Sequence, residues 1–91
     1  MSTTDVAVIQ GVGPGLGAAL ARRFARGGLA VGLFARSAES TVATKEAIER
    51  DGGRAMALAC DAGDAASVAN ALGRVREELG EVTVYVHNAS T

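Results

Sequence analysis

The chain is short of the residues that crosslink a small protein or build metal centres. Its 91 residues include one cysteine, one histidine, one proline, one tyrosine, two phenylalanines and no tryptophan. Cys60 has no partner for an internal disulfide, and one cysteine with one histidine cannot form a tetrahedral zinc site without several carboxylates. We therefore expect no metal centre. At the end of an apolar segment, Cys60 is expected to be a small buried residue, with a reactive thiol as the alternative.

The chain also lacks an excess of charge of one sign and any long hydrophobic run. Nine basic and ten acidic residues give a net charge of -1, which gives no reason to expect binding to nucleic acid or to an anionic membrane. The longest apolar stretch, Leu29–Ala35, is far shorter than the roughly 20 residues of a membrane-spanning helix. Asp5 lies where a signal peptide would need apolar residues. We expect a cytoplasmic protein without membrane segments.

Glycine and small apolar residues are abundant, with 12 glycines and 48% hydrophobic residues. Short apolar segments that end in glycines or polar residues predict strands at Asp5–Gln10, Leu29–Phe34, Arg54–Cys60 and Val82–Val86. Amphipathic segments with capping residues predict helices at Gly15–Arg26, from an N-cap at Ser37 to about Asp51, and from an N-cap at Asp64 to about Leu79. This alternation predicts an α/β fold, in which right-handed crossovers join the strands of a parallel, doubly wound sheet.

Two of the helices carry expected inward faces. In the first, the apolar residues recur at three- and four-residue spacing: Leu16, Ala19, Leu20 and Phe24. In the second, Val42, Ile48 and the alanines are expected to face the sheet.

A glycine-rich loop joins the first predicted strand to the first predicted helix: Gly11-Val12-Gly13-Pro14-Gly15-Leu16-Gly17. Gly11 permits a sharp turn, Gly13 and Gly15 allow the backbone to approach a pyrophosphate, and Gly17 allows close packing of the helix on the sheet. Pro14 suits the first turn of a helix, whose free amides bind phosphates. The alternative is a tight turn that binds nothing. A phosphate-loop NTPase is excluded because the only lysine, Lys45, is distant from the loop.

The second predicted strand ends in Ala35-Arg36-Ser37, without the acidic residue that a NAD-selective site places there. A guanidinium in this position can form charge-assisted hydrogen bonds with the 2'-phosphate of NADP. Arg36 therefore favours NADP over NAD, and the alternative is a solvated arginine at the end of a strand.

The glycine loop, Arg36, the pair Asp61-Ala62 and the segment His87-Asn88-Ala89-Ser90 together resemble the classical short-chain dehydrogenase/reductase family over nearly the whole chain. The resemblance implies a partial Rossmann-type sheet of order 3-2-1-4 in a single domain, the N-terminal dinucleotide-binding half of such an enzyme. It implies that Asp61 approaches the adenine, whereas the alternative for Asp61 is a loop acid that accepts from nearby amides. The expected cofactor-binding residues are Gly11, Gly13, Pro14, Gly15, Leu16, Gly17, Arg36, Ser37, Asp61, Ala62, Asn88 and Ala89.

The family pattern is not complete. Gln10 stands where the family commonly has threonine, and His87 and Ser90 differ from an Asn-Asn-Ala-Gly segment. The resemblance also implies a catalytic serine and a tyrosine followed four residues later by lysine, and Tyr85 does not fit because Ala89 follows it at that spacing. We expect no catalytic residue in this chain and a structural role for His87.

Two interpretations of function stay open. The chain is either the NADP-binding part of an oxidoreductase acting on a carbonyl or alcohol, with the catalytic half beyond Thr91, or a dinucleotide-binding or assembly module without chemistry. In both cases an apolar fourth strand at the edge of the sheet predicts self-association or marginal stability.

Overall fold

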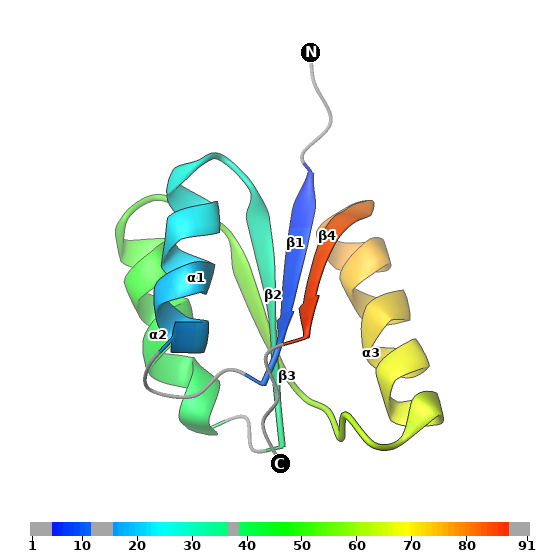
Figure 1. Cartoon of the computed structure of the whole chain (residues 1–91). Helices are drawn as coiled ribbons and strands as arrows, with labels where there is room; N and C mark the ends of the chain where they lie inside the picture. The colour runs from blue at the N-terminus through cyan, green and yellow to red at the C-terminus, as the bar shows by residue number, and fades with distance from the viewer. Residues whose placement is uncertain (1–4, 12–15, 37–38, 88–91) are drawn as a thin grey trace.

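The computed structural model describes residues 5–11, 16–36 and 39–87. Four strands alternate with three helices in this part of the chain (Figure 1). The elements in order are β1 (Val6–Gln10), α1 (Leu16–Arg26), β2 (Ala30–Ala35), α2 (Glu39–Arg50), β3 (Ala55–Ala59), α3 (Ala65–Glu78) and β4 (Val82–His87). Every predicted helix and strand is present, and each bound lies within two residues of the predicted one.

All pairs of neighbouring strands are parallel, in the order β3-β2-β1-β4. The predicted order is therefore confirmed. β1 pairs with β2 from Val6 opposite Ala30 to Gln10 opposite Phe34. Its pairing with β4 shifts by one residue between Val6 and Ala7, which leaves Thr83 as the extra residue of a bulge.

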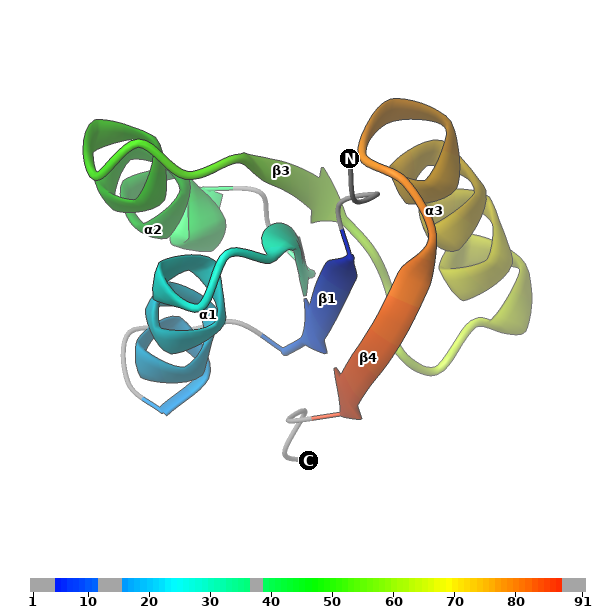
Figure 2. The same ribbon diagram turned by 90° about the horizontal axis from the view of Figure 1, so that it is seen from above.

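Helices cover both faces of the sheet (Figure 2). Helices α1 and α2 lie on one face, above Ile9, Val31 and Leu33, whereas α3 lies on the other face, above Val8 and Phe34. β1 and β2 are buried along their whole length because they are central and covered on both sides. The edge strands β3 and β4 are only partly buried.

Local sequence explains where the helices begin and end. Asp64 caps α3, since its carboxylate accepts from the amides of Ala66 at 3.0 Å and Ser67 at 3.4 Å. After α1 the chain turns at Gly28, which has a φ of 97°. Residues with a side chain rarely adopt this backbone conformation. Both positions agree with the predicted helix boundaries.

The expected inward faces of α1 and α2 need correction. Val42 is 44% exposed, and α2 instead buries Thr41, Thr44 and Ile48. These three positions follow the spacing of one helical face, which Val42 and Ile48, six residues apart, do not share.

Among the side chains of α1 that the structure describes, that of Ala21 is fully buried and that of Ala19 is exposed. Leu20 and Phe24 pack against the core as predicted, and the side chain of Leu16 lies outside the described ones. The short side chain of Ala21 suits the position because a helix lies close to its neighbours where side chains are small.

Helix α3 packs closely against the centre of the sheet through Val75, which has no exposed surface. A β-carbon added at Gly32 in β2 would lie 3.2 Å from Cγ2 of both Val75 and Val8. Gly32 is therefore the place at which the sheet makes room for the helix.

Val75→Ala tests this packing. We expect the variant to lower the free energy of unfolding by about 2 kcal/mol, because it removes two buried methyl groups and leaves a cavity above Gly32. The matched control is Val42→Ala, which removes the same groups from an exposed helical position and should change stability by less than about 0.5 kcal/mol. Urea unfolding of both variants measures the difference, and equal losses would contradict the assignment of Val75 to the core.

Candidate dinucleotide-binding site

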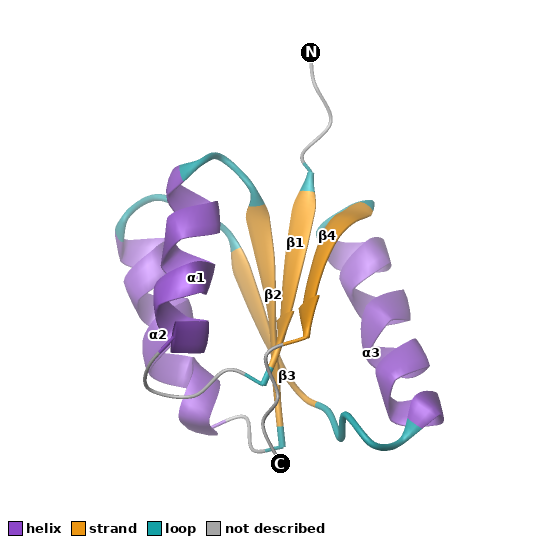
Figure 3. Ribbon diagram, in the orientation of Figure 1, coloured by secondary structure: helices purple, strands orange, loops and turns teal. Residues whose placement is uncertain are grey.

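The predicted cofactor-binding residues that the structure describes lie at the carboxyl ends of the strands or, for Leu16 and Gly17, at the start of α1. Gly11 follows β1, Arg36 follows β2, and Asp61 and Ala62 come shortly after β3. Figure 3 shows β1 and β4 ending at the edge of the sheet where α1 begins. In open parallel sheets this edge binds ligands, at the point where the strand order reverses. Here that point lies between β1 and β4.

Backbone hydrogen bonds hold this edge in register. The amide of Gly11 donates to the carbonyl of Phe34 at 2.7 Å, and the amide of Cys60 donates to the carbonyl of Ala35 at 2.7 Å. The first glycine of the loop and the residues around Arg36 and Asp61 are thus connected through β2.

The described part of the glycine loop has the geometry that its sequence predicts. Gly11 has a φ of 92°, which a residue with a side chain would adopt only with strain. Leu16 is the first residue of α1, and Gly17, which follows it, is buried. Gly13, Pro14 and Gly15 lie outside the described residues, as do Ser37, Asn88 and Ala89.

Arg36 is exposed immediately after the buried strand β2. Among the side chains that the structure describes, those of residues 5–11, 17–36 and 41–87, ion pairs join only Lys45 to Glu49 and Arg74 to Glu78. No described carboxylate therefore neutralises the Arg36 guanidinium, which can pair with an anion at this edge.

Asp61 forms local hydrogen bonds in its loop, which was the predicted alternative to a contact with adenine. One carboxylate oxygen accepts from the amide of Gly63 at 2.9 Å, and the Asp61 amide donates to the hydroxyl of Ser67 at 3.1 Å. Both bonds are local and fix the turn into α3. The side chain is nevertheless exposed, so its contact with a cofactor stays a prediction.

The structure adds Gln10, which the sequence identified only as a departure from the family pattern. Its side chain is 1% exposed at the end of β1. The carboxamide oxygen accepts from the Tyr85 hydroxyl at 3.3 Å and from the Cys60 thiol at 3.6 Å. The sequence did contain a signal for these bonds, because Gln10 is a polar residue at the end of an apolar strand. If such a residue is buried, it requires hydrogen-bond partners.

Cys60, Tyr85 and His87 also lie at this edge of the sheet. Cys60 is 2% exposed, which confirms the expectation of a small buried residue. The rings of Tyr85 and His87 contact each other edge to face, with centroids 6.4 Å apart. Burial, and secondarily the negative charge of Cys60 when ionised, raise the pKa of Tyr85 above its ordinary value of 10.0.

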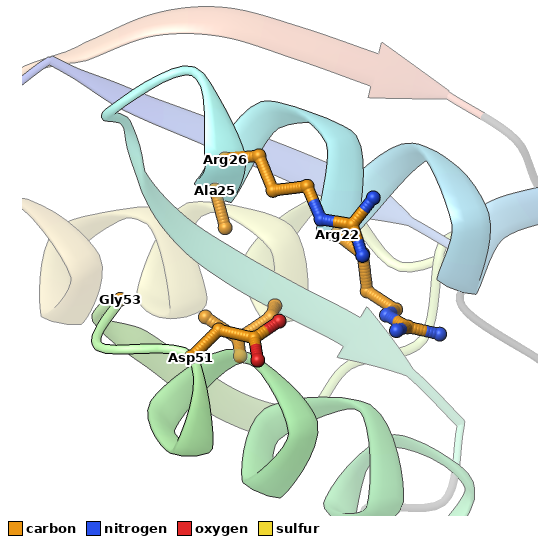
Figure 4. Close-up of a pocket in the computed structure, with 6 residues that line it drawn as sticks. Arg22, Ala25, Arg26, Asp51 and Gly53 are labelled. Carbon is orange, nitrogen blue, oxygen red and sulfur yellow. The ribbon is translucent and has the colours of Figure 1, made fainter.

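A separate hollow lies at the opposite end of the helices from this edge (Figure 4). Its walls come from the C-terminal parts of α1 and α2 and from the turn after α2: Arg22, Ala25, Arg26, Ile48, Asp51 and Gly53. None of the predicted cofactor-binding residues is among them. In the described segments we find no group of three or more His, Cys, Asp or Glu side chains that would hold a metal ion, and no helix long and apolar enough to cross a membrane.

Comparison with known proteins agrees with this architecture. The family model of the short chain dehydrogenases matches residues 5–91. The short-chain reductase protein NovJ of Streptomyces niveus is 40% identical over 89 residues, covering 98% of this chain and 34% of NovJ. A metagenomic short-chain oxidoreductase solved in complex with NADP has a TM-score of 0.90 at 35% identity, covering 98% of this chain and 40% of that one. An actinorhodin polyketide ketoreductase solved with NADPH also has a TM-score of 0.90, at 31% identity, covering 100% of this chain and 36% of that one.

The parallel sheet and its glycine turn place the protein in the class of Rossmann-type α/β proteins. Within that class, the chain belongs to the short-chain dehydrogenase/reductase family. It spans about a third of the length of the curated relatives it matches.

Tyr85 can be followed alone, because it is the only tyrosine and tryptophan is absent. We expect its absorbance titration to have a midpoint above 10.0 in the folded protein and near 10.0 in denaturant. Between these two pKa values the unfolded chain has lost the phenolic proton and the folded chain has kept it. The contribution of Tyr85 to stability is therefore complete below pH 10.0 and lost as the pH rises through the folded-state pKa.

The control for this titration is Tyr85→Phe. This variant should not show the loss of stability that accompanies deprotonation of Tyr85 at high pH. A folded-state midpoint at or below the denatured one would contradict the burial of the hydroxyl.

Proposed function

We propose that this chain is the NADP(H)-binding N-terminal part of a short-chain dehydrogenase/reductase that interconverts a carbonyl and an alcohol. The observation that carries the proposal is the position of Arg36. Its exposed guanidinium follows the strand whose Phe34 carbonyl holds the amide of Gly11. A dinucleotide with its pyrophosphate at Gly11 would therefore extend its adenosine half toward Arg36.

Three further features support this function. The turn at Gly11 and the buried Gly17 are the glycine positions that a nucleotide-binding turn requires. The start of α1 at Leu16 directs free amides toward the same edge, which stabilises phosphate charge. Structures of similar proteins contain NADP or NADPH.

In this proposal the residues of the chain bind and orient the cofactor. The expected set is Gly11, Gly13, Pro14, Gly15, Leu16, Gly17, Arg36, Ser37, Asp61, Ala62, Asn88 and Ala89. The nicotinamide ring supplies or accepts the hydride when the cofactor is bound. The groups that orient the carbonyl and supply its proton are proposed to lie outside these 91 residues, since Tyr85 has Ala89 rather than lysine four positions later.

The proposal is tested by titrating the 91-residue chain with NADPH and, separately, with NADH, following nicotinamide fluorescence. We expect NADPH to bind more tightly, and Arg36→Ala to weaken NADPH binding by roughly 10- to 100-fold, which corresponds to about 1.5–3 kcal/mol for hydrogen bonds to a charged group. NADH binding should change little, because NADH has no 2'-phosphate.

Arg76→Ala is the matched control, because Arg76 is also exposed but lies on α3, away from the carboxyl edge. It should leave both affinities unchanged. Equal binding of the two nucleotides, or a preference for NADPH that survives Arg36→Ala, would contradict NADP selection by Arg36.

The second candidate function is that of an assembly module, favoured by the edge strand β4. Among the described residues, β4 pairs only with β1, and one side of its backbone has no strand partner. Tyr85 on this strand is 42% exposed. Exposed strand edges pair with other chains unless charge, proline or bulges prevent it, and only the bulge at Thr83 is present here.

We expect the purified chain to self-associate with increasing concentration in sedimentation velocity. Thr83→Lys should suppress this association, because a charge on the edge strand opposes strand pairing. Val42→Lys adds the same charge at an exposed position of α2 and serves as the control. A monodisperse monomer that unfolds cooperatively at every concentration would rule out this candidate.

A further inference from the structure

The hydrogen bonds of Gln10 connect the ends of three strands, of which β3 is joined directly by the backbone ladder to neither β1 nor β4. The hydroxyl donor comes from Tyr85 in β4, 75 residues away, and the thiol donor from Cys60 just after β3, 50 residues away. β1 and β3 are not neighbours, because β2 lies between them. One carboxamide oxygen, with its two lone pairs, thus links the ends of β1, β3 and β4.

Each of these strand ends leads directly into a proposed cofactor-binding segment. Gly11 follows Gln10, Asp61 follows Cys60, and β4 ends at His87, the residue before Asn88. A displacement between any two of these ends would change the distance between groups that must contact one dinucleotide at the same time. Such small misplacements weaken binding although every contacting residue is still present.

We propose that Gln10 is a positioning residue for the dinucleotide, which acts by holding the ends of β3 and β4 against the end of β1 through Cys60 and Tyr85. This inference rests on the proposed function of the site.

We expect the stability of the fold to depend little on these bonds. The bond from the Tyr85 hydroxyl to Gln10 is only part-buried, so we expect this hydroxyl to bind water when Gln10 is replaced. The Cys60 thiol is a weak donor that tolerates an apolar neighbour. The core cluster that contains Cys60 is otherwise apolar and includes Val6, Val8, Phe34 and Val75. Replacing Gln10 by leucine therefore removes the connection while conserving approximate volume.

The test is a double-mutant cycle on the full chain, with NADPH affinity as the readout. Tyr85→Phe and Gln10→Leu should each raise the Kd about three- to tenfold, the effect expected for one neutral hydrogen bond. The double variant should be no weaker than Gln10→Leu alone, because both substitutions break the same bond. Thr83→Val, which removes a β4 hydroxyl that donates to the Val6 carbonyl at 3.5 Å instead, should leave the Kd unchanged.

Cys60 offers a conservative rescue. Cys60→Ser retains a donor for Gln10 and should bind NADPH like the wild type, whereas Cys60→Ala should bind less tightly. A role in packing alone would not distinguish serine from alanine in this way, since both are smaller than cysteine. Thermal unfolding of each variant separates a loss of affinity from a loss of folded protein.

The outcomes separate this inference from the proposed function. If the wild-type chain fails to bind NADPH, the proposed function is wrong and the inference fails with it. If the wild type binds and the Gln10, Tyr85 and Cys60 variants bind equally well, only the positioning role is overturned. Additive losses in the double variant would overturn it too.

Discussion

The burial of β1 on both faces is the constraint on which the rest of the structure depends. Val6, Val8 and Ile9 have no exposed surface, because α3 covers one face of the strand and α1 the other. A slip of this strand by one residue would turn its buried side chains to the opposite face, so its pairing with β2, and with β4 beyond the bulge at Thr83, fixes its register. The position of β1 therefore fixes the positions of Gln10 and Gly11 at the carboxyl edge.

That fixed place explains how a small chain can assemble the carboxyl edge of its sheet from distant segments. Backbone bonds bring the end of β2 to Gly11 and the end of β3 to Ala35. The side chain of Gln10 then reaches across β2 to Cys60 and sideways to Tyr85. The edge is thus organised by the central strand, and the exposed Arg36 contributes charge to it without taking part in the packing.

Much of the fold could be predicted because its signals are local and continuous. The apolar runs of β1 and β2, the capping carboxylate of Asp64 and the glycine after α1 each determine structure within a few residues. The inward face of α2 was missed because the helix buries two threonines, Thr41 and Thr44, whereas the apolar Val42 points outward. The partners of Gln10 could not be predicted, since bonds to residues 50 and 75 positions away depend on the tertiary arrangement.

The central claim is that the carboxyl edge of the sheet binds the dinucleotide, and amide chemical-shift mapping with NADP tests it most directly. The account predicts shift changes that cluster at Gly11, Gly17, Arg36 and Asp61, at the ends of three different strands and the start of α1. Changes that cluster instead around the hollow at Arg22, Arg26 and Asp51, or the absence of any change, would contradict it.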